Sequence, residues 1–220
     1  MFPGILSESS FHSKTRPMIT VIDIGLGNVR SVSNALHFLR VDHLVTGDCG
    51  AMRNADRLIF PGVGSFSEAS TRLFQTGVGQ CVQEMVLSKR KPILGICLGM
   101  QLLAKEGEEG GISRGLGLID ARVLKLQVPA SGCRLPHIGW NDITNNGMTI
   151  LKGIEDGTCF YFVHSYAMVV NEPCARATCE YGASFNAAVQ KGHICGTQFH
   201  PEKSRESGLQ VLRNFIAEQF

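Results

Sequence analysis

A cysteine between two glycines is the first arrangement in this chain that could do chemistry. It stands in Gly95-Ile96-Cys97-Leu98-Gly99, after a short apolar run. A buried strand that turns sharply between glycines into a helix lifts the turn residue into a pocket, as in the nucleophile elbow of hydrolases. The N-terminal end of a helix beginning at Leu98 favours a thiolate at Cys97. Gln101 follows one helical turn later and would project over the same pocket. The pattern predicts a nucleophilic thiol.

A base and an orienting carboxylate occur near the other end of the chain. The predicted strand Ile194–Phe199 ends at His200, Pro201 stiffens the next step, and Glu202 follows. A nucleophilic cysteine needs a base, and the base needs a group that fixes its orientation. A buried structural cysteine with a surface histidine is the alternative, since free cysteine is often a small core residue. The three residues together favour a Cys–His–Glu triad.

Alternating strands and helices must position these side chains, and the pattern predicts an α/β fold. Parallel strands place their ligands at their carboxyl ends. The glycine-rich turn Gly62-Val63-Gly64 follows the third strand, so a backbone N–H there could serve as an oxyanion donor beside the N–H of Leu98. The first half is predicted to hold strands at Met18–Asp23, His43–Thr46 and Arg57–Phe60, and helices at Ser31–Leu39, Phe66–Phe74, Val78–Lys89 and Met100–Ala104.

The second half is strand-rich and predicts antiparallel additions to a mostly parallel sheet. Lys105–Arg114 is polar and glycine-rich and is predicted to be a solvated loop, and Pro136–Asn141 a turn. Ser165 and Tyr166 follow a strand and could offer backbone groups to an amino acid, whereas His164 is interpreted as a core histidine. Strands are predicted at Val123–Val128, Gly157–Val163, Ala167–Val170, Ala175–Glu180, Ala187–Gln190 and Ile194–Phe199, with a last helix at Ser207–Glu218.

Composition narrows the class of protein. The 220 residues suit an irregular tail over 1–17 and one domain over 18–220. A net charge of +2 gives no argument for nucleic acid or a membrane, and no apolar run approaches a membrane span. Eight cysteines without a Cys-x-x-Cys motif suggest a reduced, cytoplasmic chain and no zinc site. Gly25-Leu26-Gly27 lacks the third glycine of a dinucleotide fingerprint, so NAD binding is not expected. No other cofactor is predicted.

These motifs resemble the class I glutamine amidotransferases over residues 18–220. The elbow with Gln101 and the His200-Pro201-Glu202 run carry the resemblance. Pro61–Gly64, Pro136–Asn141 and Tyr161–Tyr166 make the chain similar to the glutaminase subunits of imidazole glycerol phosphate synthases. The resemblance implies a three-layer fold and hydrolysis of L-glutamine to glutamate and ammonia, without metal or cofactor.

The resemblance also assigns roles to individual residues. It implies Cys97 as nucleophile, His200 as acid and base, and Glu202 as the group that orients His200. Backbone donors at Val63, Gly64 and Leu98 would hold the oxyanion, and the implied substrate contacts are Gly62, Gln101, Glu109, Ser165 and Tyr166.

The resemblance implies a partner that consumes the ammonia. That partner is a (β/α) barrel cyclase, which converts a phosphoribosyl-formimino intermediate (PRFAR) into imidazole glycerol phosphate and the carboxamide ribotide AICAR in histidine biosynthesis. The implied interface includes Asn28, Trp140, Tyr161 and Lys203.

Three alternatives stay open. The glutaminase could serve another synthase, for GMP, anthranilate or pyridoxal phosphate, although Pro136–Asn141 and Tyr161–Tyr166 argue against it. A non-catalytic member of the fold would be expected to lack part of the triad. A peptidase is disfavoured because Gln101 suits an amino-acid pocket.

Overall fold

A computed structural model describes residues 17–128 and 132–220. The predicted tail therefore lies outside the described residues except for Pro17. The strands are β1 Ile19–Ile22, β2 His43–Thr46, β3 Arg57–Gly62, β4 Ile93–Cys97, β5 Glu106–Gly107, β6 Ser113–Arg114, β7 Ala121–Lys125, β8 His137–Asn145, β9 Thr158–His164, β10 Tyr166–Val170, β11 Ala175–Glu180, β12 Ser184–Lys191 and β13 Ile194–Thr197. The α-helices are α1 Val29–Phe38, α2 Cys49–Arg53, α3 Phe66–Gln75, α4 Val78–Gln83, α5 Leu98–Gln101 and α6 Arg205–Ala217; η1 (Glu84–Ser88) is a π-helix, and η2 (Thr149–Leu151) and η3 (Pro201–Lys203) are 3-10 turns.

A nine-stranded sheet in the order β2-β1-β3-β4-β13-β12-β11-β8-β9 organises the molecule. The first five strands in that order, β2, β1, β3, β4 and β13, pair in parallel. The remaining neighbours, from β13 to β9, pair antiparallel. A second, four-stranded sheet has the order β10-β7-β5-β6. The predicted α/β fold with antiparallel additions is confirmed.

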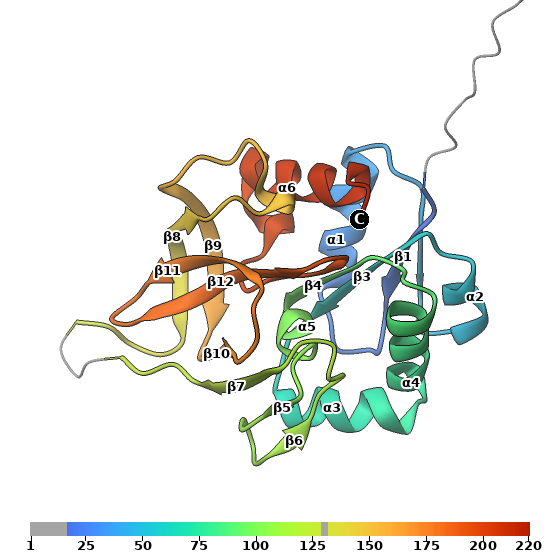
Figure 1. Cartoon of the computed structure of the whole chain (residues 1–220), viewed down its shortest axis with the longest axis horizontal. Helices are drawn as coiled ribbons and strands as arrows, with labels where there is room; N and C mark the ends of the chain where they lie inside the picture. The colour runs from blue at the N-terminus through green and yellow to red at the C-terminus, as the bar shows by residue number, and fades with distance from the viewer. Residues whose placement is uncertain (1–16, 129–131) are drawn as a thin grey trace, which may run out of the picture.

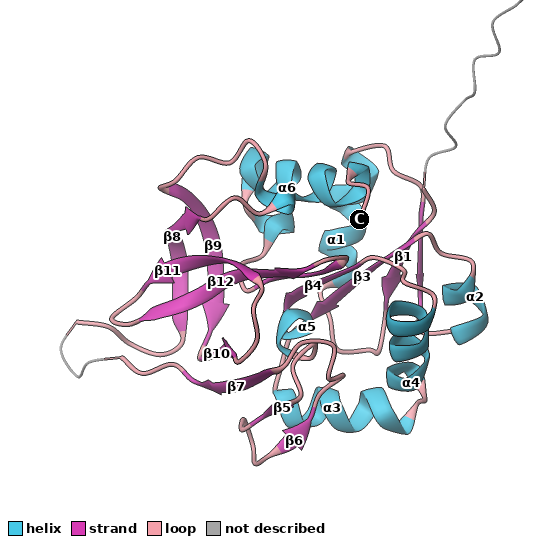
Figure 2. Ribbon diagram, in the orientation of Figure 1, coloured by secondary structure: helices cyan, strands magenta, loops and turns pink. Residues whose placement is uncertain are grey.

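Helices cover both faces of the parallel half and give three layers (Figures 1 and 2). Successive side chains of a strand point to opposite faces. Ile59 of β3 therefore packs with α1 and α6, whereas its neighbours Leu58 and Phe60 pack with α3 and α4. Strands buried on both faces read as continuous apolar runs, which explains why their positions were readable in the sequence.

Four predicted segments need correction. Pro136–Asn141 is not a turn, because His137 begins the nine-residue strand β8. The Lys105–Arg114 loop contains the short strands β5 and β6. The helix predicted at Met100–Ala104 is α5, which begins earlier and ends at Gln101. The single helix predicted at Val78–Lys89 is α4 followed by the π-helix η1.

Candidate active site

The elbow at Cys97 has the strained backbone that the glycines predict. Cys97 joins β4 to α5 with φ 54° and ψ −112°, in the positive-φ region that side chains seldom adopt. A Cβ on Gly99 would lie 1.7 Å from the carbonyl oxygen of Phe60, and one on Gly95 would lie 2.6 Å from that of Gly99. Close packing of α5 on β3 and β4 thus requires both glycines and holds Cys97 at the strand end.

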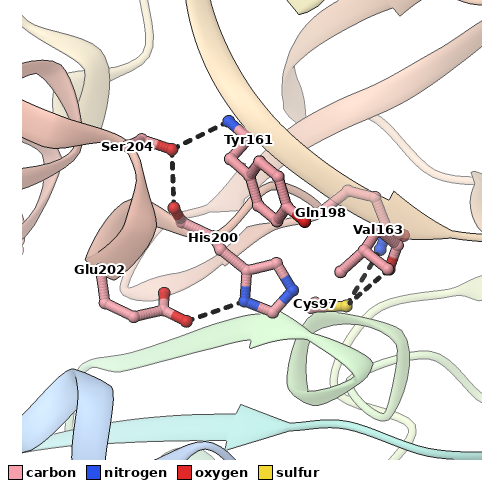
Figure 3. A network of polar contacts seen from close by, with 7 residues as sticks. All are labelled: Cys97, Tyr161, Val163, Gln198, His200, Glu202 and Ser204. Carbon is pink, nitrogen blue, oxygen red and sulfur yellow. Dashed lines mark hydrogen bonds and ion pairs between the residues drawn. The ribbon is translucent and has the colours of Figure 1, made fainter. Parts of the chain in front are cut away.

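His200 and Glu202 form a buried pair that faces Cys97. Nδ1 of His200 lies 2.8 Å from Oε1 of Glu202, and the two side chains are 2% and 1% exposed. The other ring nitrogen points toward the Cys97 sulfur (Figure 3). Burial lowers the pKa of His200, but its interactions with Cys97 and Glu202 outweigh burial and raise the pKa to about 10. The imidazole is therefore charged at neutral pH, and the three side chains lie in the predicted order.

The turn after β3 lies beside the elbow. Gly62 pairs with Cys97 across the parallel strands. The N–H of Val63 donates to the carbonyl oxygen of Leu26 at 3.3 Å, so this N–H is already bonded. Gly64 has φ +103°, and a Cβ built on it would meet nothing within 4 Å. Any use of the Val63 N–H by a ligand therefore requires that its bond to Leu26 be broken.

A cavity of about 290 Å³ opens over the thiol. It brings together most of the residues predicted to bind substrate, whereas Gly62 is not among its lining residues. The lining comprises Val63, Gly64, Cys97, Leu98, Gln101, Glu109, Pro136, Val163, His164, Ser165, Tyr166 and His200. Gln101 enters it from α5, Glu109 from the β5–β6 connection, and Ser165 and Tyr166 from the β9–β10 corner.

Two of these lining residues are held by the protein itself. Oε2 of Glu109 accepts the backbone N–H of Phe66 at 2.8 Å, at the start of α3. Nε2 of Gln101 donates to the carbonyl oxygen of Tyr166 at 2.9 Å and to Oε1 of Gln198 at 3.0 Å. Both amide hydrogens of Gln101 are thus used internally, and its carbonyl oxygen is the polar atom left for a ligand.

His164 is the core histidine that the sequence suggested. Its Nδ1 bonds to the carbonyl oxygen of Tyr166 at 2.9 Å and its Nε2 to Nδ1 of His137 at 3.1 Å. A carbonyl only accepts, so His164 is protonated on Nδ1 and His137 donates to it. Burial lowers the pKa of each histidine to about 4. Both rings are neutral at neutral pH, and His164 lines the cavity with His137 as its fixed hydrogen-bonding partner.

Gln198 is the residue at the site that sequence reasoning missed. Its side chain is fully buried and donates from Nε2 to the Cys97 sulfur at 3.7 Å (Figure 3). The available signal was a polar residue inside the run Thr197-Gln198-Phe199, which precedes His200. A buried amide there must find partners.

Three of the four predicted interface residues gather on the surface. Trp140 of β8 and Tyr161 of β9 are paired across the strands, with ring centroids 6.1 Å apart. The Lys203 ammonium lies 5.7 Å from the Tyr161 ring, and the Arg205 guanidinium lies 5.0 Å from the Trp140 ring. Asn28 lies apart from these contacts, just before α1, a helix that packs against η3.

Other kinds of site find no support in residues 17–128 and 132–220. No group of three or more His, Cys, Asp or Glu side chains there could hold a metal ion. Among the helices of that part of the chain, none has the length and apolar character needed to cross a membrane. All eight cysteines are free thiols.

Comparison with known proteins identifies the family. A family model described as glutamine amidotransferase class-I matches residues 20–219. The imidazole glycerol phosphate synthase subunit HisH 1 of Campylobacter jejuni is 42% identical over 200 residues, covering 90% of this chain and 99% of that protein. The subunit HisH of Methanosarcina acetivorans is 44% identical over 202 residues, covering 90% and 97%.

Solved structures support the fold. PurLQS from Thermotoga maritima matches with a TM-score of 0.69 at 18% identity, over 92% of this chain and 98% of that one. A glutamine amidotransferase from the same organism matches with a TM-score of 0.62 at 19% identity, over 91% and 83%. The chain belongs to the class-I glutamine amidotransferase family.

Proposed function

We propose that the chain is the glutaminase subunit of an imidazole glycerol phosphate synthase, and that Cys97, His200 and Glu202 hydrolyse L-glutamine. The observation that carries the proposal is the buried His200–Glu202 pair facing Cys97 at a cavity of about 290 Å³. The names of the relatives, which are 42% and 44% identical over almost their whole length, support the choice of synthase.

In the first half-reaction, the Cys97 sulfur attacks the side-chain carbonyl carbon of glutamine. The tetrahedral oxyanion is stabilised by backbone N–H groups of Leu98 and of the Val63–Gly64 turn. His200, charged in the resting site because its pKa is about 10, gives its proton to the departing nitrogen. The carbon–nitrogen bond breaks, and ammonia leaves a γ-glutamyl thioester on Cys97.

In the second half-reaction, His200 accepts a proton from water as the water oxygen attacks the thioester carbonyl. The carbon–sulfur bond breaks, glutamate leaves, and the Cys97 thiolate faces a charged His200 again. Glu202 keeps the ring in the required orientation throughout, through its bond to Nδ1.

The remaining cavity residues would bind the amino-acid end of glutamine. The carboxylate of Glu109 and the free carbonyl oxygen of Gln101 suit the α-ammonium group, since both accept hydrogen bonds. Ser165 and Tyr166 supply groups at the opposite wall.

The Val63 N–H bonded to Leu26 suggests that the resting chain is a slow enzyme. Loss of one oxyanion donor typically lowers kcat by about 100- to 1,000-fold. We propose that a (β/α) barrel cyclase binds over Trp140, Tyr161 and Lys203, takes up the ammonia, and favours the active form of the turn. Asn28, which precedes α1, would extend the same interface, because α1 packs against η3.

The test measures glutamate release from L-glutamine by the chain alone, and by the chain with a barrel cyclase and PRFAR. Slow release alone, a rise of about 100-fold in the complex, and no release by Cys97→Ser are expected. Full activity that is the same with and without the cyclase would support the triad mechanism but assign the chain to another synthase. Activity retained by Cys97→Ser would overturn the mechanism.

A further inference from the structure

Gln198 contacts the nucleophile but is not among the residues that line the cavity. It follows β13 and precedes His200 by two residues. Its side chain is fully buried, and its backbone N–H donates to the carbonyl oxygen of Ala187 at 2.8 Å. The backbone is therefore fixed at this position, and the side chain has no route to solvent.

The orientation of the Gln198 amide is determined by its neighbours. The carbonyl oxygen of Tyr166 can only accept, so the atom of Gln101 that lies 2.9 Å from it must be the amide nitrogen. The same nitrogen lies 3.0 Å from the Gln198 side chain, which must present its oxygen there. The Gln198 nitrogen is then left for the Cys97 sulfur, at 3.7 Å. A chain of obligatory donors and acceptors thus directs an N–H to the sulfur.

The strength of the hydrogen bond from that N–H depends on the charge of the sulfur. As a thiol, Cys97 donates to the carbonyl oxygen of Val163 at 3.7 Å. As a thiolate it has no hydrogen to donate, and the Val163 oxygen becomes an unfavourable neighbour. The Gln198 N–H then makes a stronger hydrogen bond, because hydrogen bonds to an ionised acceptor are about twice as strong as those between neutral groups.

We infer that Gln198 is a positioning residue for the nucleophile: its amide holds the Cys97 sulfur in place and stabilises it as a thiolate. The catalytic role of Gln198 rests on the proposed function, in which Cys97 is the nucleophile. The same amide links the sulfur, through Gln101, to the Tyr166 carbonyl at the wall where the substrate would bind.

Other titratable groups lie around the same cavity as the sulfur. His200 faces it directly and carries Glu202 behind it. His164, Tyr166 and Glu109 line the same cavity. Since burial keeps His164 neutral by lowering its pKa to about 4, the nearest positive charge above that pH is His200. The effect of Gln198 would be measured in addition to that of His200.

The experiment compares Gln198→Met and Gln198→Glu with the unchanged chain. Methionine keeps the length of the side chain and removes the donor, whereas glutamate keeps the shape and replaces the nitrogen by oxygen. The pH dependence of Cys97 alkylation by iodoacetamide would be followed by mass spectrometry of its peptide, which separates it from the other cysteines. Gln83→Met is the matched control, because the Gln83 amide also donates one hydrogen bond, but to the backbone carbonyl of Leu116, away from Cys97.

We expect the midpoint pH of Cys97 alkylation to rise by about one unit in Gln198→Met and further in Gln198→Glu. kcat/KM for glutamine should fall about tenfold, with the midpoint unchanged in Gln83→Met. An unchanged midpoint in a folded Gln198 variant would overturn the inference, whatever its melting temperature. Alkylation needs no glutaminase activity, so a shifted midpoint in a chain inactive on glutamine would uphold the inference and reject the function.

Discussion

Two opposing effects determine the pKa of the His200 imidazole. Its burial disfavours charge, yet its neighbours Cys97 and Glu202 raise its pKa to about 10. The balance depends on Glu202, whose side chain is 1% exposed and so acts with little screening by water. Glu202 therefore fixes the orientation of the ring and, after Cys97, contributes most to keeping the ring charged.

The first prediction concerns Glu202→Gln. The amide keeps the shape and removes the negative charge, so the pKa of His200 should fall below about 10. The alkaline limb of the profile of kcat/KM against pH reports loss of the charged ring, and it should move to lower pH. Activity at neutral pH should fall by about 100-fold. The measurement is glutamate release against pH in the complex with the cyclase.

Glu206→Gln serves as the control for Glu202→Gln. Glu206 is an acid at the start of α6, paired with Arg213 and 73% exposed at its side chain. It should leave the profile unchanged. A Glu202→Gln profile that overlies that of the unchanged chain would contradict the role proposed for the carboxylate.

At the scale of elements, the elbow depends on how closely α5 approaches β3. The four-residue helix α5 is too short to be stable by itself and is held by its packing. Its glycine lies against the Phe60 backbone, where a Cβ would come within 1.7 Å of the carbonyl oxygen. Backbone cannot move aside as a flexible side chain can, so the contact fixes the position of Cys97.

The second prediction follows for Gly99→Ala. The methyl group forces α5 away from β3, and the free energy of unfolding should fall by at least about 3 kcal/mol, with loss of glutaminase activity. Urea unfolding of the purified chain provides the measurement. Gly50→Ala in α2 is the control, since its Cβ would meet only the Asp48 side chain, at 3.1 Å. It should change stability by less than about 1 kcal/mol. Equal losses in the two variants would refute the argument.

The sequence predicts elements well where the information is local. Strands β2 and β11 have the predicted bounds residue for residue. The strained turn at Cys97 could be predicted because the two glycines around it act on the backbone beside them. Helix α2 was missed although Asp48 caps it through the Ala51 N–H, since five residues give too short a pattern for periodicity.

Non-local pairing accounts for the larger errors. Pro136 and Gly139 are typical of a turn, yet β8 runs through this segment because β9 pairs with it from His137 to Ile143. Gly139 has φ +138°, which a strand accommodates at a glycine. The partner of the Val63 N–H and the orientation of Gln198 likewise depend on residues far away in the chain. No local pattern could have supplied them.

At the scale of the whole molecule, the site lies where the parallel and antiparallel halves of the sheet meet. Cys97 ends β4 and His200 follows β13, which are adjacent strands. Strand β9 belongs to the antiparallel half, and β10, which follows it after the corner, belongs to the second sheet (Figure 1). Ligands of open α/β sheets bind at the carboxyl ends of such strands. The surface around Trp140 belongs to β8 and β9 and so connects directly to the wall of the cavity.

That surface has the character of a protein interface. Trp140 and Ile138 are 46% and 60% exposed and, two residues apart, share one face of β8. Lys203 and Arg205 lie against the rings of Tyr161 and Trp140. Aromatic residues and arginine are enriched where proteins bind one another, and tryptophan is frequent among the residues that carry most of the binding energy.

The third prediction is that Trp140→Ala weakens coupling to the proposed cyclase partner more than it weakens folding. Half of the side chain is already exposed, so the free energy of unfolding should change by less than about 2 kcal/mol. Removal of an interface anchor costs about 2 kcal/mol or more of binding, so the cyclase concentration for half-maximal stimulation of glutamate release should rise about 30-fold. Leu44→Ala is the control, because Leu44 is 45% exposed on β2, at the opposite edge of the sheet. If the tryptophan variant loses secondary structure when isolated, or needs no more cyclase than the leucine variant, then Trp140 serves the fold and the partner binds elsewhere.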